Sequence, residues 1–170
     1  MPRYTLLQIT LHWAVAVLLP LQYWTGGSIE RTHHAVHMGL SPDPWDVIQH
    51  HVHRYVGIAV GALMVSRLAL RILCRAAEKV LVVNVVERVS KAFHFAFYAA
   101  VIAQAGMGFI ASYFWFGIAP FHVIGSRIIL GLLALHISAA AWHTLVWRDD
   151  TVDRMIFPRK RRLAEYLQSN

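Results

Sequence analysis

Three histidines stand in the last long apolar stretch of the chain, at positions 122, 136 and 143. Imidazole nitrogens bind metal ions and exchange protons near neutral pH, and ionisable groups in such stretches usually serve a function. On an ideal helix the step from His122 to His136 is close to four turns, so both rings lie within about 40° of one face and about 21 Å apart along the axis. His143 falls within roughly 20° of His136. The spacing predicts a column of imidazoles that faces the interior of a helical bundle.

Four apolar stretches are each long enough to provide a membrane-spanning helix, which needs about 20 residues. They cover about residues 4–25, 51–73, 93–116 and 121–147. The chain is 57% hydrophobic and 15% charged, and this balance is typical of membrane proteins rather than soluble ones. We therefore expect an all-α integral membrane protein, a four-helix bundle that forms a single domain over residues 1–170. The only cysteine, Cys74, excludes an intrachain disulfide.

The distribution of lysine and arginine predicts the orientation of the bundle. One set of connections carries few basic residues, namely Arg31, Arg54 and Arg127. The other carries Arg3, Arg71, Arg75, Lys79, Arg88, Lys91, Arg148, Arg154 and the basic run at 159–162. Both termini are therefore expected in the cytoplasm. The net charge of +7 is explained by this asymmetry, so we expect contact with the lipid bilayer and no nucleic acid as a partner.

Histidines on other predicted helices match those of the last helix in depth. His12 lies near the depth of His136, while His50, His51 and His53 lie level with His122. Axial ligation of a haem requires two imidazoles at one depth on different helices. The sequence therefore predicts one pair from His12 with His136, and a second from His122 with one of the helix-two histidines.

Two such pairs predict two haems stacked across the membrane, each iron held by two imidazoles. Filled axial positions favour one-electron transfer over dioxygen binding. His94 and His143 lie at similar depth near the cytoplasmic surface and are alternative or additional ligands of the inner haem. A lone histidine at any of these positions is also explained as a core residue bonded to a backbone carbonyl.

These residues resemble the prokaryotic cytochrome b561 family, di-haem membrane proteins of four helices, over almost the whole chain. The resemblance rests on "RYTLLQITLHW", on "HRYVG" with "SRLALR", and above all on the ending "LHISAAAWHTLVWRDDTVDRMIFPRK". It implies that His12, His53, His122 and His136 ligate haem iron, which selects His53 over His50 and His51. It also implies that His143 is a second, non-ligand histidine near a quinone head group.

The segment "FGIAPFHVIGSR" departs from the family pattern, because relatives often have a longer outer loop and "HET" at the outer ligand. Some family members oxidise superoxide at the outer haem and reduce ubiquinone on the inner side. The resemblance thus implies a superoxide:ubiquinone oxidoreductase of the bacterial inner membrane, a multi-pass protein. Arg54 and Arg127 are candidates for attracting the superoxide anion, and His143, Arg67 and Arg71 for the quinone site.

Two other functions are consistent with the sequence. The chain can serve as a haem-bearing membrane anchor that relays electrons for a partner dehydrogenase or hydrogenase, with a redox protein as partner. It can also transport metal ions, because His33, His34 and His37 would form a cluster on a helix. Transport is less favoured, since the predicted spans contain no carboxylate that would bind hard cations or couple to protons.

Overall fold

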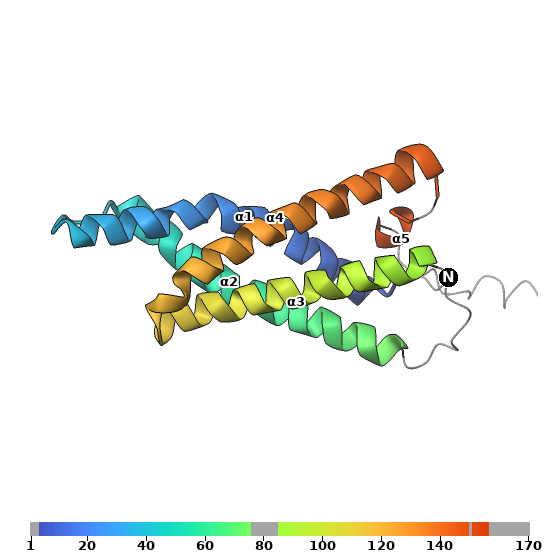
Figure 1. The fold of residues 1–170 in the computed structure, drawn as a ribbon, viewed down its shortest axis with the longest axis horizontal. Helices are drawn as coiled ribbons and strands as arrows, with labels where there is room; N and C mark the ends of the chain where they lie inside the picture. Colours follow the sequence, from blue (N-terminus) through green and yellow to red (C-terminus); the bar gives the residue numbers. More distant parts are fainter. Residues whose placement is uncertain (1–3, 76–84, 150, 157–170) are drawn as a thin grey trace, which may run out of the picture.

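The computed structural model describes residues 4–75, 85–149 and 151–156, and all regular structure in these ranges is helical. Four long helices follow one another, α1 (Leu6–His37), α2 (Pro44–Arg75), α3 (Val85–Tyr113) and α4 (Ala119–Trp142) (Figure 1). Three short elements complete the fold, the 3-10 turn η1 (Phe116–Ile118), the π-helical turn η2 (His143–Trp147) and α5 (Asp153–Ile156). Four candidate spans are long and apolar enough to cross a membrane. The predicted all-α architecture with four spans is confirmed.

The long helices pack in sequence order, α1 on α2, α2 on α3 and α3 on α4. In the described part of the chain α1 and α4 bring no Cα atoms within 8 Å of each other, and neither do α2 and α4. Helices packed directly on one another have axes about 8–10 Å apart. A side chain bridges the wider gap, because the Tyr23 hydroxyl on α1 donates to the Ser126 carbonyl oxygen on α4 at 2.6 Å. Contacts of α4 with α1 and α2 are therefore made by side chains rather than by close backbone packing.

The buried core is small. It consists of Val15, Leu19, Val60, Met64, Tyr98, Val101 and Ile129. Between 6% and 17% of each span's apolar window is buried inside the protein, so most apolar side chains face outward. In a membrane protein this outer surface contacts lipid, which is as apolar as the core itself.

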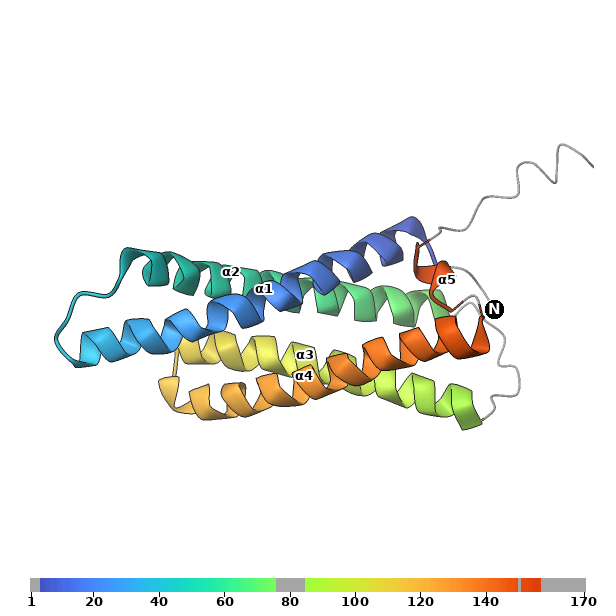
Figure 2. The same cartoon turned by 90° about the horizontal axis from the view of Figure 1, so that it is seen from above.

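The described ends of the chain, Tyr4 and Ile156, lie at the same end of the bundle, which we call the terminal end (Figure 2). The opposite end, which we call the loop end, holds the connections after α1 and α3. At the terminal end the Trp13 indole N–H donates to the Met155 carbonyl oxygen at 2.9 Å and attaches α5 to α1. The cytoplasmic location of this end stays a prediction; Arg3, Lys79 and the basic run at 159–162, on which it partly rests, lie outside the described residues.

Two helices are longer than the apolar stretches predicted. α1 continues to His37, so "RTHHAVH", which lies beyond the predicted span 4–25, is helical, and α2 begins at Pro44 rather than near residue 51. A helix of 32 residues is about 48 Å long, whereas the hydrocarbon core is about 30 Å thick. Figure 2 shows both helices continuing past the turn that joins α3 and α4. An apolar stretch predicts only the part of a helix that lies in the membrane. The backbone hydrogen bonds of the helix can continue past the last apolar residue.

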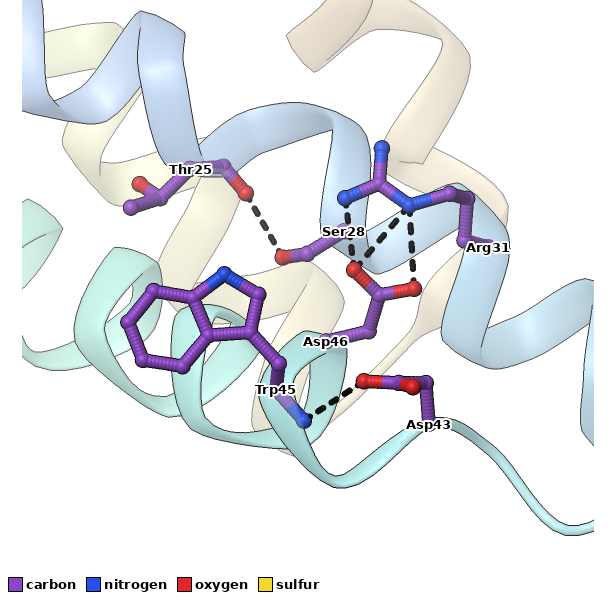
Figure 3. Close-up of polar contacts among 6 residues, drawn as sticks. All are labelled: Thr25, Ser28, Arg31, Asp43, Trp45 and Asp46. Carbon is purple, nitrogen blue, oxygen red and sulfur yellow. Dashed lines mark hydrogen bonds and ion pairs between the residues drawn. The ribbon is translucent and has the colours of Figure 1, made fainter.

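Polar contacts hold the projecting ends of α1 and α2 together (Figure 3). Arg31 and Asp46 form an ion pair with an N···O distance of 2.6 Å, and Arg31 also donates through Nε to both carboxylate oxygens. The Asp43 carboxylate accepts from the Trp45 N–H at 2.7 Å and caps the start of α2. The connection between the two helices is therefore limited to residues 38–43.

Candidate functional site

At the loop end the ring of His53 on α2 meets the ring of His122 on α4. Their centroids lie 6.2 Å apart with an angle of 80° between the ring planes. The rings of His50 and His51 contact other side chains instead: His50 contacts His33, and His51 contacts Tyr55. Of the three helix-two histidines left open by spacing, His53 is the one that the fold brings to His122.

Backbone carbonyls orient both rings of this loop-end pair. Nδ1 of His53 lies 3.1 Å from the Gln22 carbonyl oxygen, and Nδ1 of His122 lies 3.1 Å from that of Gln104. A carbonyl oxygen only accepts, so each Nδ1 carries the proton and each Nε2 keeps its lone pair. Metal-bound histidines usually show this arrangement, with the second nitrogen donating to a carbonyl or carboxylate. Both rings therefore offer Nε2 as a ligand atom.

Gly108 on α3 gives the His122 ring its space. A Cβ at Gly108 would lie 2.9 Å from Cε1 of His122 and 3.3 Å from Nδ1, closer than side-chain atoms normally pack. Gly106, two residues earlier on the same helix, has no atom within 4 Å of the corresponding position. Gly61 serves ordinary helix packing, because its Cβ would meet the Cβ of Ala105 on α3. The glycine at 108 is thus needed for the approach of the ring.

At the terminal end the ring of His12 on α1 meets the ring of His136 on α4. Their centroids are 6.3 Å apart and the ring planes are inclined at 63°. Phe93 stacks on His136 at 6.2 Å with parallel planes, and Phe97 lies 5.9 Å from it. α3 thus packs two aromatic rings against the terminal-end pair.

Arg67 on α2 contacts the terminal-end pair. Its Nη1 donates to Nδ1 of His12 at 2.9 Å. A guanidinium only donates, so Nδ1 of His12 uses its lone pair here and the neutral ring carries its proton on Nε2. Ligation through Nε2 of His12 therefore requires this bond to be released. Arg67 would then become available for another acceptor.

His94 on α3 is a third imidazole at the terminal end. Its ring centroid is 5.7 Å from that of His136, with perpendicular planes. Nδ1 of His94 donates to the Ser90 carbonyl oxygen at 2.6 Å, which leaves the lone pair of Nε2 available. The structure thus gives His136 two neighbouring imidazoles, and the alternative ligand named from the sequence lies in contact with it.

The separations of the two ring pairs fit a shared iron. An imidazole nitrogen lies about 1.1 Å from its ring centroid and binds a first-row metal at about 2.0 Å, so two rings on opposite sides of one metal ion have centroids about 6.2 Å apart. The observed centroid distances are 6.2 Å and 6.3 Å. Each pair joins two helices that have no close backbone contact. The ring separations and the imidazole donors of both pairs therefore suit the ligation of one haem iron by each pair.

Arg54 lies directly after His53 on α2 and carries a buried polar atom without a partner. Its guanidinium carbon lies 5.0 Å from the ring centroid of Tyr55 and 5.6 Å from that of Tyr113. Its Nη2 donates to Nδ1 of His51 and to the Tyr55 hydroxyl, whereas Nε is buried and forms no hydrogen bond. Buried donors are normally paired. Nε of Arg54 is thus positioned to bind an anionic group at the loop end. Arg127, the other basic candidate, is exposed.

The three candidates for a quinone site lie on separate elements. Arg67 and Arg71 lie near Tyr98, with guanidinium carbons 5.9 Å and 5.8 Å from its ring centroid. His143 begins the π-helical turn after α4 and contacts Asp149. Within the described ranges α2 and this turn bring no Cα atoms within 8 Å of each other. The structure places all three at the terminal end without bringing the arginines to His143.

The histidines at the end of α1 do not form a metal centre with their neighbours. His33 stacks on Phe116 at 5.2 Å and contacts the ring of His50 at 5.5 Å. In the part of the chain that the structure describes, no three His, Cys, Asp or Glu side chains gather closely enough to hold a metal ion. The cluster of His33, His34 and His37 considered for metal transport is thus not assembled into such a site.

Comparison with known proteins agrees with a four-helix membrane cytochrome. A family model described as prokaryotic cytochrome b561 matches residues 3–158. Cytochrome b562 of Cereibacter sphaeroides is 32% identical over 162 residues, covering 93% of this chain and 98% of that protein. No solved structure gives a significant match. The match runs through all four candidate spans and all four paired histidines, so the chain belongs to the prokaryotic cytochrome b561 family and is a membrane haem protein of electron transfer.

Proposed function

We propose that the chain carries single electrons across the bacterial inner membrane from superoxide to ubiquinone, as one domain holding two b haems. The inner haem is held by His12 and His136, and the outer haem by His53 and His122. The observation that carries this proposal is the pair of cross-helix imidazole contacts at 6.2 Å and 6.3 Å. The loop end faces the periplasm and the terminal end the cytoplasm, because basic residues are concentrated at the terminal end.

A haem held by each ring pair would supply one-electron redox chemistry. The chain orients the rings of His53 and His122 through the carbonyls of Gln22 and Gln104 at the outer site. The aromatic rings of Phe93 and Phe97 pack against His136 at the inner site. The ring pairs are about 21 Å apart along α4, so together they cover most of the hydrocarbon thickness.

The donor and acceptor are those that the resemblance to superoxide-oxidising family members implies, and the basic residues at the two ends suit them. At the outer end the half-buried guanidinium of Arg54, with its unpaired Nε, attracts and orients superoxide, which leaves as dioxygen after losing one electron. The same Nε is equally suited to a haem propionate. At the inner end His143 provides a donor for one quinone oxygen, and Arg67 and Arg71, which lie apart from His143, provide donors elsewhere at this end. Reduction of one quinone to quinol consumes two electrons from two superoxide ions and two protons.

Stopped-flow mixing of the purified, oxidised protein with superoxide tests this function. We expect the absorption bands of reduced b haem to appear, and to decay to the oxidised spectrum when a short-chain ubiquinone is present. Haem that stays oxidised in superoxide would contradict the proposed donor. Reduced haem that persists in the presence of ubiquinone would contradict the proposed acceptor.

The close approach of Gly108 to the outer site yields a further prediction. In Gly108→Ala the new methyl group displaces the His122 ring from its bond with the Gln104 carbonyl. Loss of such an orienting bond typically weakens metal binding about 10- to 100-fold, so we expect the variant to lose outer haem during dilution and purification. Gly106→Ala is the matched control, because its methyl group enters open space. Equal haem retention in both variants would contradict the role of Gly108.

A relay subunit for a partner redox protein is the second candidate function. It is favoured by the projecting ends of α1 and α2, where the large apolar side chains of Val36, Met38, Leu40 and Trp45 are exposed. Such side chains beyond the membrane suit a protein contact. A relay subunit is expected to co-purify with a dehydrogenase or hydrogenase and to show no superoxide-to-quinone activity alone. Full superoxide-to-quinone activity of the isolated chain would contradict this alternative.

A further inference from the structure

The end of α4 folds back on itself through an unusual backbone. The π-helical turn His143–Trp147 is followed by Arg148, which adopts the left-handed conformation with φ 50°. This conformation is uncommon for residues other than glycine, asparagine and aspartate, and π-helical turns occur frequently at functional sites. The reversal brings the Asp149 N–H to the His143 carbonyl oxygen at 3.2 Å. The carboxylate of Asp149, six residues after His143, is thereby brought next to the His143 ring.

The side chains of His143 and Asp149 form a short hydrogen bond. Nδ1 of His143 lies 2.6 Å from Oδ2 of Asp149, while Oδ1 accepts from the Thr151 N–H at 2.9 Å. The edge of Trp147 packs on the His143 ring, with centroids 4.6 Å apart. Hydrogen bonds from Thr151 and His143 lower the pKa of the Asp149 carboxyl to about 2, so the group is ionised at neutral pH. A carboxylate accepts only, and therefore Nδ1 of His143 carries a proton.

We propose that Asp149 is a positioning residue for proton transfer to the quinone. It fixes the His143 ring with Nδ1–H on the carboxylate, so that Nε2, which bonds no described residue, faces the quinone oxygen. This inference rests on the proposed function. A carboxylate that holds the distal nitrogen of a catalytic imidazole sets both its tautomer and its orientation.

Reduction of one quinone to quinol takes up two protons together with two electrons. The imidazolium Nε2–H bond of His143 breaks and an O–H bond forms on one quinone oxygen. His143 then regains a proton from water at the terminal end, and the second quinone oxygen takes its proton from the same aqueous side. The two electrons come from two superoxide ions, which leave as two dioxygen molecules. The carboxylate of Asp149 keeps its charge throughout.

The test is Asp149→Asn in the full-length, haem-loaded protein, with superoxide as donor and a short-chain ubiquinone as acceptor. We expect kcat for quinone reduction to fall about 10- to 100-fold, with KM changed less than about threefold. Haem reduction by superoxide without quinone is expected at the wild-type rate. Asp153→Asn removes the same charge from the exposed start of α5 and serves as the matched control. Asp149→Glu, which keeps the carboxylate, is expected to recover part of the loss.

Two further readouts separate positioning from a structural role. The double variant H143Q/D149N is expected to lose no more activity than H143Q, because both changes disable one unit. Nitrogen NMR of labelled histidine is expected to show Nδ1–H at His143 in the wild type and a mixture of tautomers in Asp149→Asn. Wild-type kcat, additive losses or an unchanged tautomer in the variant would overturn this inference and leave the proposed function standing. Wild-type protein that cannot reduce ubiquinone would overturn both.

Discussion

His136→Ala is expected to lower the haem content of the purified protein from two haems per chain to one. The His136 ring is the common neighbour of His12 at 6.3 Å and His94 at 5.7 Å, so its removal leaves the inner iron without a ligand from α4. The outer ring pair, about four helical turns away, keeps its own bonds to backbone carbonyls. The check is pyridine haemochrome absorbance per protein, together with the visible spectrum of the remaining haem.

Two controls make this result specific. His37→Ala removes an exposed imidazole at the end of α1 and is expected to retain both haems. His12→Ala and His94→Ala then identify the second ligand of the inner haem: we expect His12→Ala to lose the haem and His94→Ala to retain it. Full haem content in His136→Ala would refute the assignment of the inner site.

His122→Ala is expected to remove the outer haem and to slow superoxide-driven reduction of the remaining haem at least about 100-fold. The physical reason is distance, because the outer ring pair is the one near Arg54 and the loop end. The inner haem is expected to remain and to be reduced by dithionite at its usual wavelength. Stopped-flow absorbance after mixing with superoxide measures the rate.

The helix-two histidines provide the matched comparison for this prediction. His53→Ala is expected to reproduce the effect of His122→Ala, since the two rings are in contact. His50→Ala, one turn earlier on the same helix, is expected to keep both haems and the wild-type rate, because its ring contacts His33 and His51. If His50→Ala lost the outer haem and His53→Ala kept it, the register of the outer site would be wrong.

The number and type of the helices could be predicted because each span needs a long apolar stretch and such stretches are unmistakable. The level pairing of His12 with His136 followed from helical rise alone, and the rings are in contact. The residues at which α1 ends and α2 begins could not be predicted from the apolar pattern. α1 extends to His37, and α2 begins as early as Pro44. The Arg31–Asp46 ion pair and the Asp43 cap stabilise these two helices beyond their apolar parts. Contacts of this kind depend on tertiary structure.

Details of the sites depended on geometry that spacing does not determine. Spacing left His50, His51 and His53 equivalent, and the rotation of α2 about its axis separates them. The bond from Arg67 to His12 joins residues on different helices, so no local pattern signals it. The contact of Asp149 with His143 needs both a π-helical turn and a left-handed arginine, and a sequence read as an ideal helix predicts neither.

Quantification of haem in the purified wild-type protein tests the central claim most directly. If each ring pair, His12 with His136 and His53 with His122, binds one haem, the pyridine haemochrome assay gives two b haems for every polypeptide. A fully loaded preparation that contains one haem or none for every polypeptide would contradict the account.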